Sequence, residues 1–321
     1  MLRLLSALTA LAFVTAASPA TAQDNFPSRN VRLVVSFPPG GGIDAVARMF
    51  AEKLTALLGQ TVVVENRGGA SGTIAGKAVA AAEADGYTVL VASNSMLIAQ
   101  VMNPKIGLDA TKDLQALASA APQAVIVVAQ PDLPAGSLKE LVALAKTRKL
   151  NYGSPGAGSI GHLVGEYLFS TASGVKLEHI PFPGAAQALT GLLGKQTDLA
   201  VVTLPPTATL VQAGKIKGIV VSTAARSAAL PQVQSVADAG ITGFSASAWT
   251  GFFVPAKTPK SISGKLGDAI IKVAAMPDIK AKLAKLGFEP TSVPGPQFQR
   301  DVAAELKRWT EVVEKAGIRP K

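Results

Sequence analysis

Apolar residues recur along this chain with two periods, one typical of buried strands and one typical of amphipathic helices. Val31–Val35 is a β-branched apolar run, which predicts a buried parallel strand. After it, apolar residues follow at three- and four-residue steps, as in a helix, at Val46, Met49, Phe50, Leu54, Leu57 and Leu58. Further strands are predicted at 61–65 and 87–92, with a helix at 74–82 between them. Strands separated by helices predict a parallel sheet with right-handed crossovers.

A second group of elements begins with Val125–Ala129, a predicted strand that carries the chain into another domain. It continues with strands at 176–180, 197–202 and 216–222, and with helices at 138–148, 162–172 and 187–193. A strand at 248–254 and helices at 261–275 and 297–316 close the chain. We therefore expect two α/β domains with a hinge and an interdomain cleft: domain 1 from residues 23–124 and 224–321, and domain 2 from residues 125–223. Two connecting segments are typical of a hinge-bending clamshell.

Two glycine-rich loops stand out against this pattern, each between a predicted strand and a predicted helix. The first is Ser36-Phe37-Pro38-Pro39-Gly40-Gly41-Gly42-Ile43-Asp44, and the second is Gly153-Ser154-Pro155-Gly156-Ala157-Gly158-Ser159. Unpaired backbone N–H groups and the positive end of the helix dipole meet at such a junction, and glycines let a ligand approach the backbone. We expect the two loops to face each other across the cleft and to hold an anion.

Two further turns share the expected sheet edge. Residues 66–73 form another glycine-rich turn, and Ser93-Asn94-Ser95 places three small polar groups after a predicted strand. Ligands of open parallel sheets bind at the carboxyl ends of the strands, so these turns are expected beside the first loop.

The N-terminus has the pattern of a secretory signal peptide. Arg3 is followed by the apolar stretch Leu4–Val14, and Ala20-Thr21-Ala22 is a small-residue cleavage site. We expect residues 1–22 to be removed by cleavage after Ala22 and the mature protein to be periplasmic. The alternative is a membrane anchor, which the polar residues of this stretch and the absence of a basic stop-transfer segment disfavour.

Charge and cysteine content exclude several classes of site. The formal net charge is +10, but lysine and arginine are scattered along the chain and no basic run with interleaved aromatics occurs, so nucleic-acid binding is not expected. The chain has no cysteine, which rules out disulfides and thiolate metal sites. We expect a monomer that binds a small molecule and needs no cofactor.

The candidate catalytic and cofactor motifs are weak. Residues 156–161 match G-x-G-x-x-G, but Pro155 disturbs the strand-to-turn geometry that a dinucleotide site requires. His162 and Glu166 have metal-ligand spacing without a third ligand nearby, and no G-x-S-x-G elbow is present. Asp44 lies in a first helical turn, where a carboxylate stabilises the helix dipole. We expect neither a catalytic residue nor a bound metal.

Ordered motifs along most of the mature chain resemble the Bug-type extracytoplasmic solute receptors of tripartite tricarboxylate transporters. The motifs are Phe37–Gly42 with Asp44 and Ala47-Arg48, Val64–Arg67 with 69–74, Asp85–Thr88, Asn151–Gly156 with Gly158-Ser159 and His162-Leu163, His179–Phe182 with Gly184, and Trp249 with Gly251 and Val254-Pro255. The resemblance implies a type II periplasmic-binding-protein fold, a carboxylate ligand in the cleft, and delivery to membrane transporter subunits. It also implies that backbone N–H groups, hydroxyls and water meet the anion, rather than an arginine.

Position by position, the resemblance and the loop analysis give one set of expected ligand-binding residues. They are Phe37, Pro39, Gly40, Gly41, Gly42, Ile43, Asp44, Thr73, Ser93, Asn94, Ser154, Pro155, Gly156, Ala157, Gly158, Ser159, His162, Gly184, Ala185 and Thr203. Three of them depart from the family pattern, since Ile43, Ala185 and Thr203 stand where threonine, serine and aspartate are common. Fewer polar side chains suggest a ligand with a larger apolar body, such as a dicarboxylic or aromatic acid. An exported enzyme or a sensory adaptor that acts on a carboxylate is the alternative function.

Overall fold

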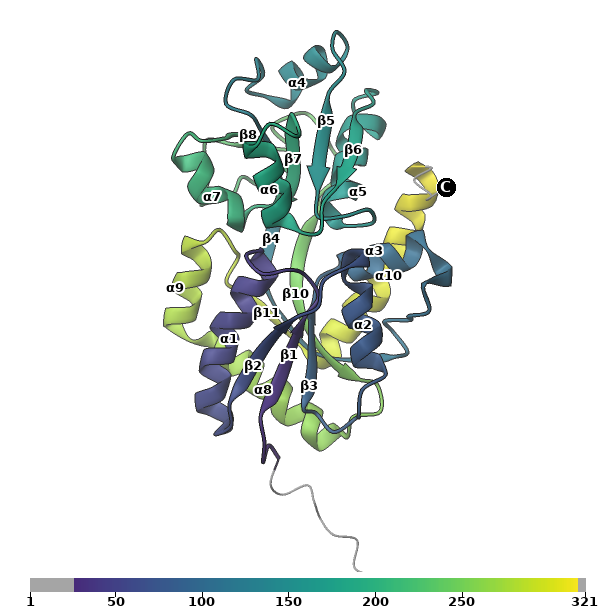
Figure 1. Ribbon diagram of the computed structural model, residues 1–321, viewed down its shortest axis with the longest axis vertical. Helices are drawn as coiled ribbons and strands as arrows, with labels where there is room; N and C mark the ends of the chain where they lie inside the picture. The colour runs from purple at the N-terminus through teal and green to yellow at the C-terminus, as the bar shows by residue number, and fades with distance from the viewer. Residues whose placement is uncertain (1–25, 317–321) are drawn as a thin grey trace, which may run out of the picture.

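The computed structural model describes residues 26–316, which form two α/β lobes stacked end to end (Figure 1). The predicted signal peptide, residues 1–22 with cleavage after Ala22, lies outside the described residues. Among the described residues, no helix combines the length and the hydrophobicity that a membrane span requires.

The first lobe is built on a mixed sheet with the strand order β2-β1-β3-β10-β4. Its parallel part consists of β1 (Val31–Val35), β2 (Val62–Asn66) and β3 (Thr88–Ala92). β10 (Ser247–Pro255) is antiparallel to both β3 and β4 (Leu114–Ala129), and β11 (Ser292–Pro294) is antiparallel to β4. The predicted parallel sheet is confirmed for the first three strands, and the strands that follow them in this lobe add antiparallel pairs to it.

Helices cover both faces of the first sheet. Apolar residues of α1 (Gly42–Leu58) and α8 (Lys260–Ala275) form one core with the strands, and α9 (Pro277–Lys285) adds Ile279 and Leu283 to it. The opposite core is formed by α2 (Thr73–Ala80), α3 (Ser95–Met102) and α10 (Gly295–Ala316). Both faces are buried, which explains why β1 and β3 are apolar at every position except the exposed Arg32 and Thr88 at the start of β3.

The second lobe has its own sheet, in which β4 pairs with β7 and β8 and the order continues through β5 to β6. Its strands are β5 (Asn151–Ser154), β6 (Glu178–Pro181), β7 (Leu199–Thr203), β8 (Lys217–Val221) and β9 (Gln234–Ser235). Its helices are α4 (Leu138–Ala145), α5 (Ile160–Glu166), α6 (Ala185–Leu193) and α7 (Pro205–Gln212), with a π-helical turn at Tyr167–Thr171 after α5.

β4 and β10 run between the lobes (Figure 1). The first part of the 16-residue β4 pairs with β10, and its last five residues pair with β7. Where β4 leaves the first lobe, Ala121 has φ +51° and the register with β10 slips by one residue between Ala120 and Gln123. A bulge therefore interrupts the strand at the junction of the lobes.

Residues 224–246 pack against the second lobe, not the first. β9 pairs with β8, Leu230 and Val233 join one core of the second lobe, and Val236 joins the other. We therefore assign this segment to the second lobe, which moves the second boundary from residue 223, where the sequence analysis placed it, to about residue 246.

Close approach of α8 to β4 depends on one glycine. A methyl group on Gly267 would lie 2.9 Å from the carbonyl oxygen of Leu117, whereas one on Gly264, in the preceding turn of the same helix, would meet nothing within 4 Å. Gly267 is buried and Gly264 is exposed, so the helix rests on the sheet at only one of the two positions.

This contrast gives a paired prediction. Gly267→Ala should lower the free energy of unfolding by about 1–3 kcal/mol because the methyl group pushes α8 off β4. Gly264→Ala should raise it by about 0.5–1 kcal/mol because alanine is the better helix former. Urea unfolding of the two variants tests this, and equal effects would contradict the close packing of α8 on β4.

Candidate functional site

A cavity of about 40 Å³ lies between the lobes. It is lined by Phe37, Pro38, Gly41, Gly42, Ile43, Ser93, Ser95, Gln123, Pro155, Ile160, Ala185, Thr203 and Ala248. None of these side chains carries a charge, and both lobes contribute to the wall. The volume is enough for a few water molecules.

Five helices begin at this cavity. Ile43, Ser95, Ile160 and Ala185 belong to the first turns of α1, α3, α5 and α6, and Thr203 lies just before α7. A helix N-terminus carries a partial positive charge and, where its first residues are not proline, N–H groups without intrahelical partners. α7 begins with Pro205 and Pro206 and therefore contributes no N–H group at these two positions. The cavity is thus electropositive without a lysine or arginine in its wall, which suits a small anion.

The N-termini of α1 and α6, one from each lobe, are not capped by any side chain. Gly41 and Gly184 occupy the two N-cap positions in extended conformations and offer no oxygen to the first-turn N–H groups. The two ends approach each other, since a methyl group on Gly40 would lie 3.4 Å from Cβ of Ala186. N–H groups from both lobes are therefore available to one ligand.

A carboxylate behind the first loop holds that loop in shape. Asp44 accepts hydrogen bonds from the Gly40 N–H at 3.1 Å, from Arg48 Nε at 3.0 Å and from Asn66 Nδ2 at 2.8 Å. Asn66 also donates to the carbonyl of Phe37. Burial raises the pKa of Asp44, but the hydrogen bonds from Arg48, Asn66 and Gly40 outweigh it and leave the pKa below its ordinary value of 3.8. Asp44 is therefore a brace of the loop and not a wall of the cavity.

The polar groups of the second glycine loop form hydrogen bonds within the loop and with neighbouring residues. Ser154 Oγ lies 2.7 Å from His179 Nε2 and 3.1 Å from the carbonyl of Gly156, and Ser159 caps α5 by accepting from the His162 N–H. The Gly158 N–H donates to His162 Nδ1 at 3.2 Å. Only Pro155 of this loop lines the cavity, so the N-terminus of α6, more than the loop itself, supplies the free N–H groups of the second lobe.

The two histidines form a stacked pair behind this loop, with ring centroids 4.0 Å apart. Burial, together with the charge of His162, lowers the pKa of His179 to about 3, and burial lowers the pKa of His162 against the opposing effect of Glu166. Both rings are therefore neutral near neutral pH, and Nδ1 of His162 acts as a hydrogen-bond acceptor. Ser154 beside His179 has the spacing of a nucleophile and its base, but Ser154 is fully buried.

Direct contacts join the lobes on either side of the cavity. Ser71 Oγ donates to the carbonyl of Ala157 at 2.7 Å, and the Ile160 N–H donates to Ser95 Oγ at 3.1 Å. Gly69 to Gly72 all have positive φ, which is costly for Ala70 and Ser71. The strained turn is what brings Ser71 to the other lobe.

The structure brings some of the predicted residues together and places others behind the wall. Eight line the cavity: Phe37, Gly41, Gly42, Ile43, Ser93, Pro155, Ala185 and Thr203. Twelve do not: Pro39, Gly40, Asp44, Thr73, Asn94, Ser154, Gly156, Ala157, Gly158, Ser159, His162 and Gly184.

Several of these twelve have structural partners that explain their position. Thr73 donates to the carbonyl of Ala70, and Asn94 donates to the carbonyl of Ser247 and to Glu305. Glu305 also accepts from the indole nitrogens of Trp249 and Trp309, which ties α10 to β10. Among the described residues, no group of three acidic, histidine or cysteine side chains is placed to hold a metal ion.

Sequence reasoning missed Gln123, Ile160 and Ala248 as cavity residues, and included Pro38 and Ser95 only within their motifs. Gln123 had a usable signal, because it follows Pro122 as the lone polar residue of the otherwise apolar stretch 120–129. Ile160 and Ala248 carry no such signal, since apolar residues in a helix or strand are normally core.

Comparison with known proteins agrees with this geometry. The profile of the family described as "Tripartite tricarboxylate transporter family receptor" matches residues 46–318. The structure of the periplasmic binding protein BugD is 32% identical, with a TM-score of 0.87 over 92% of this chain and 100% of that one. Rpa4515 of Rhodopseudomonas palustris, solved with adipate, is 32% identical with a TM-score of 0.88 over 92% and 100%. MatC of the same species, solved with malate, is 30% identical with a TM-score of 0.83 over 90% and 100%.

Two α/β lobes that enclose a cavity at converging helix N-termini define a solute-binding protein of the periplasmic binding class. The chain belongs to the tripartite tricarboxylate transporter receptor family. The resemblance to Bug-type receptors and the expected two-domain α/β fold are thereby confirmed. Proteins of this family are solute receptors and not enzymes, and membership implies a periplasmic location.

The Asp44 brace predicts a pH-dependent contribution to stability. Asp44→Ala should lower the free energy of unfolding by about 1–3 kcal/mol at about pH 7, because Asn66 and the Gly40 N–H lose their acceptor. Since the pKa of Asp44 is lowered in the folded state, its stabilisation is complete above the unfolded value of 3.8 and is lost as pH falls through the folded value.

Urea unfolding at a series of pH values measures this difference. The gap between wild type and Asp44→Ala should shrink as pH falls from about 5 to about 2. Asp268→Ala, a change at an exposed carboxylate of α8, serves as the control and should stay within about 0.5 kcal/mol of wild type. A gap that is constant with pH would contradict the assigned role of Asp44.

Proposed function

We propose that this protein captures a small carboxylate in the cavity between its lobes and delivers it to the membrane subunits of a tripartite transporter. The observation that carries the proposal is the meeting of two uncapped helix N-termini, those of α1 and α6, at a cavity without charged side chains. Free N–H groups can only donate hydrogen bonds, and a carboxylate at neutral pH can only accept them. A carboxylate is therefore a suitable ligand for these groups. The relatives solved with adipate and malate support the same ligand class.

Backbone N–H groups can supply the required affinity. A hydrogen bond to a charged group contributes about 1.5–3 kcal/mol net, so four or five from preformed loops offset the cost of association. A micromolar ligand needs about −8 kcal/mol. The Asp44 brace keeps the first loop in its binding geometry before the ligand arrives, which limits the ordering cost.

The walls of the cavity favour a ligand with an apolar body. Phe37, Pro38, Ile43, Pro155 and Ile160 surround the space next to the N–H groups. The resemblance to Bug-type receptors implies hydroxyl side chains at two positions where this chain has Ile43 and Ala185, and both of these residues line the cavity. A dicarboxylate with a methylene chain, or an aromatic acid, would bury its apolar part here, whereas a short hydroxylated acid would leave hydroxyls without partners.

Closure of the lobes completes the site. The N-termini of α1 and α6 belong to different lobes, so a ligand that contacts both binds the closed arrangement better than an open one and shifts the population toward it. The β4 bulge at Ala121 and the start of β10 are the places where the chain would bend. The closed monomer, exported after cleavage at Ala22, is then the form that the membrane subunits recognise.

A thermal-shift series tests the ligand class. Adipate, benzoate, malate and citrate are compared at equal concentration, because a ligand that binds only the native state raises the melting temperature. Adipate or benzoate should give the largest shifts. A shift for citrate alone would overturn the apolar-body proposal, and no shift for any carboxylate would overturn the proposed function. Recovery of the acid unchanged after incubation separates a receptor from an enzyme.

Gly41→Val tests whether the first loop is the ligand wall. A methyl group on Gly41 meets no protein atom within 4 Å, and its φ of −87° suits valine, so the variant should fold. Its side chain would fill the space beside the α1 N–H groups and should weaken carboxylate binding at least about 100-fold, equivalent to about 2.7 kcal/mol. Titration calorimetry measures the affinity, with Gly264→Ala as the control because this change lies outside the cavity. Wild-type affinity in Gly41→Val would contradict the assignment of the first loop as the ligand wall.

A further inference from the structure

Gln123 is a buried side chain for which the protein provides no partner. It is 1% exposed, and neither its Oε1 nor its Nε2 makes a hydrogen bond within the described chain. Burying an amide without partners is costly, and native structures rarely tolerate it without a reason. Gln123 lines the cavity between the lobes, so its missing partners lie on the cavity side.

The local backbone conformation directs the Gln123 side chain toward the N-terminus of α1. The bulge at Ala121 adds one residue to β4, which puts Gln123 on the same face as Ala120 and opposite Ala248, another cavity residue. The bulge is held by hydrogen bonds from the Ala121 N–H to Thr291 and from the Glu289 N–H to Pro122. A methyl group on Gly42 would lie 2.6 Å from Gln123 Oε1 and 3.4 Å from Gln123 Nε2, so both polar atoms of the amide lie close to the first residue of α1.

A buried hydroxyl near Gln123, that of Thr250, is also without a hydrogen-bond partner among the described residues. Thr250 is fully buried, its Oγ1 makes no hydrogen bond among the described residues, and it is the next residue of β10 to face the same side as Ala248. Polar atoms are thus left without partners on two adjacent strands, and Gln123, which lines the cavity, can find partners among polar atoms that enter it.

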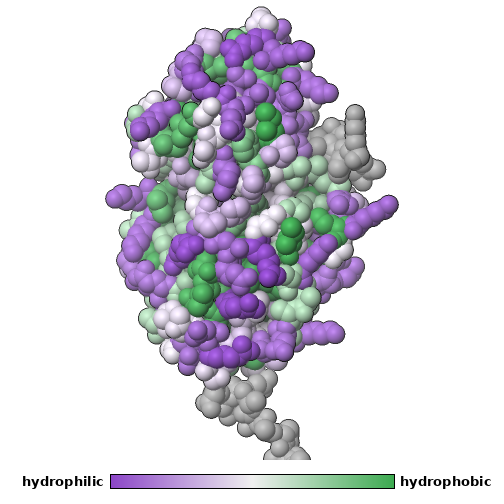
Figure 2. Space-filling view, in the orientation of Figure 1, coloured by the Kyte–Doolittle hydropathy of each residue, from purple (hydrophilic) through white to green (hydrophobic). Residues whose placement is uncertain are grey.

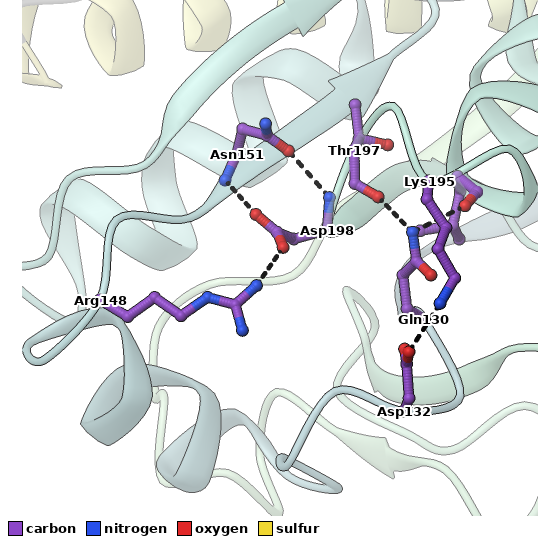
Figure 3. Close-up of polar contacts among 8 residues, drawn as sticks. Gln130, Asp132, Arg148, Asn151, Lys195, Thr197 and Asp198 are labelled. Atoms are coloured by element: carbon purple, nitrogen blue, oxygen red, sulfur yellow. Dashed lines mark hydrogen bonds and ion pairs between the residues drawn. The ribbon is translucent and has the colours of Figure 1, made fainter.

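Gln130, just past the other end of β4, shows how the same side chain behaves in a structural role. It is 8% exposed, and its Nε2 donates to the carbonyls of Leu192 at 3.0 Å and Thr197 at 2.9 Å. Figure 3 shows this amide reaching the backbone of Thr197. Burial is similar in the two glutamines, but only Gln130 has partners within the protein.

We propose that Gln123 is a specificity-determining residue whose amide N–H donates to the carboxylate held at the N-terminus of α1. Its carbonyl oxygen accepts from a water molecule that shares the cavity with the ligand. Because Gln123 lies on β4 where that strand passes between the lobes, the contact links the bound anion to the junction as well as to the two helix ends. This inference rests on the proposed function and identifies a side chain that contacts the ligand directly.

Paired methionine substitutions separate this role from a structural one. Gln123→Met removes a polar group that has no protein partner, so the melting temperature without ligand should stay the same or rise. Its dissociation constant for adipate, measured by titration calorimetry, should increase about 10- to 100-fold. Gln130→Met leaves two carbonyls unpaired and should lower the melting temperature by about 4 °C or more, with adipate affinity within about twofold of wild type.

Gln123→Glu provides a second variant of nearly the same shape. It places a negative charge beside the bound carboxylate, so adipate binding should fall at least as far as in Gln123→Met. If the wild type binds malate or benzoate but not adipate, the acid that binds is used in place of adipate in the titrations of all three variants. A melting temperature for Gln123→Met that falls as far as that of Gln130→Met, or an unchanged dissociation constant, would overturn the inference while leaving the proposed function intact. Absence of carboxylate binding in the wild type would overturn the proposed function.

Discussion

An anion taken out of water needs hydrogen-bond donors in place of its hydration shell, and this protein offers donors without offering a cation. The cavity wall holds no charged side chain, and the N–H groups come from helices that begin at its edge. α1 and α6 are the decisive pair because neither has a capping side chain and they belong to different lobes. The site is therefore whole only when the lobes are together, which links binding to closure.

Much of the remaining structure maintains that arrangement. Asp44 and Asn66 fix the first loop from behind, and the strained turn at Ser71 reaches across to Ala157. Glu305 accepts hydrogen bonds from the side chains of Asn94, Trp249 and Trp309, which precede α3 or belong to β10 and α10. Charged groups lie outside the cavity, and Figure 2 shows hydrophilic residues spread over both lobes of the visible face. The basic character of the chain is thus a property of its surface and not of its site.

Sequence patterns predicted what depends on local periodicity. The strand before the first loop, α1 and the closing helix were predicted within a few residues, because their apolar spacing is unambiguous. The first half of β4 was missed since alanine-rich residues 116–124 carry no clear period, and that strand runs between the lobes. Of the residues predicted to bind ligand, Phe37, Gly41, Gly42 and Ile43 of the first loop line the cavity, but only Pro155 of the second loop does. No sequence pattern shows that Ser154 and Gly158 form hydrogen bonds with histidines.

A crystal structure with adipate soaked in or co-crystallised tests the central claim most directly. We expect one carboxylate within about 3.2 Å of backbone nitrogens from both the α1 and the α6 N-termini, without a lysine or arginine side chain in contact. A carboxylate bound only by one lobe, paired with a basic side chain, or lying outside the cavity between Gly41 and Ala185 would contradict the account.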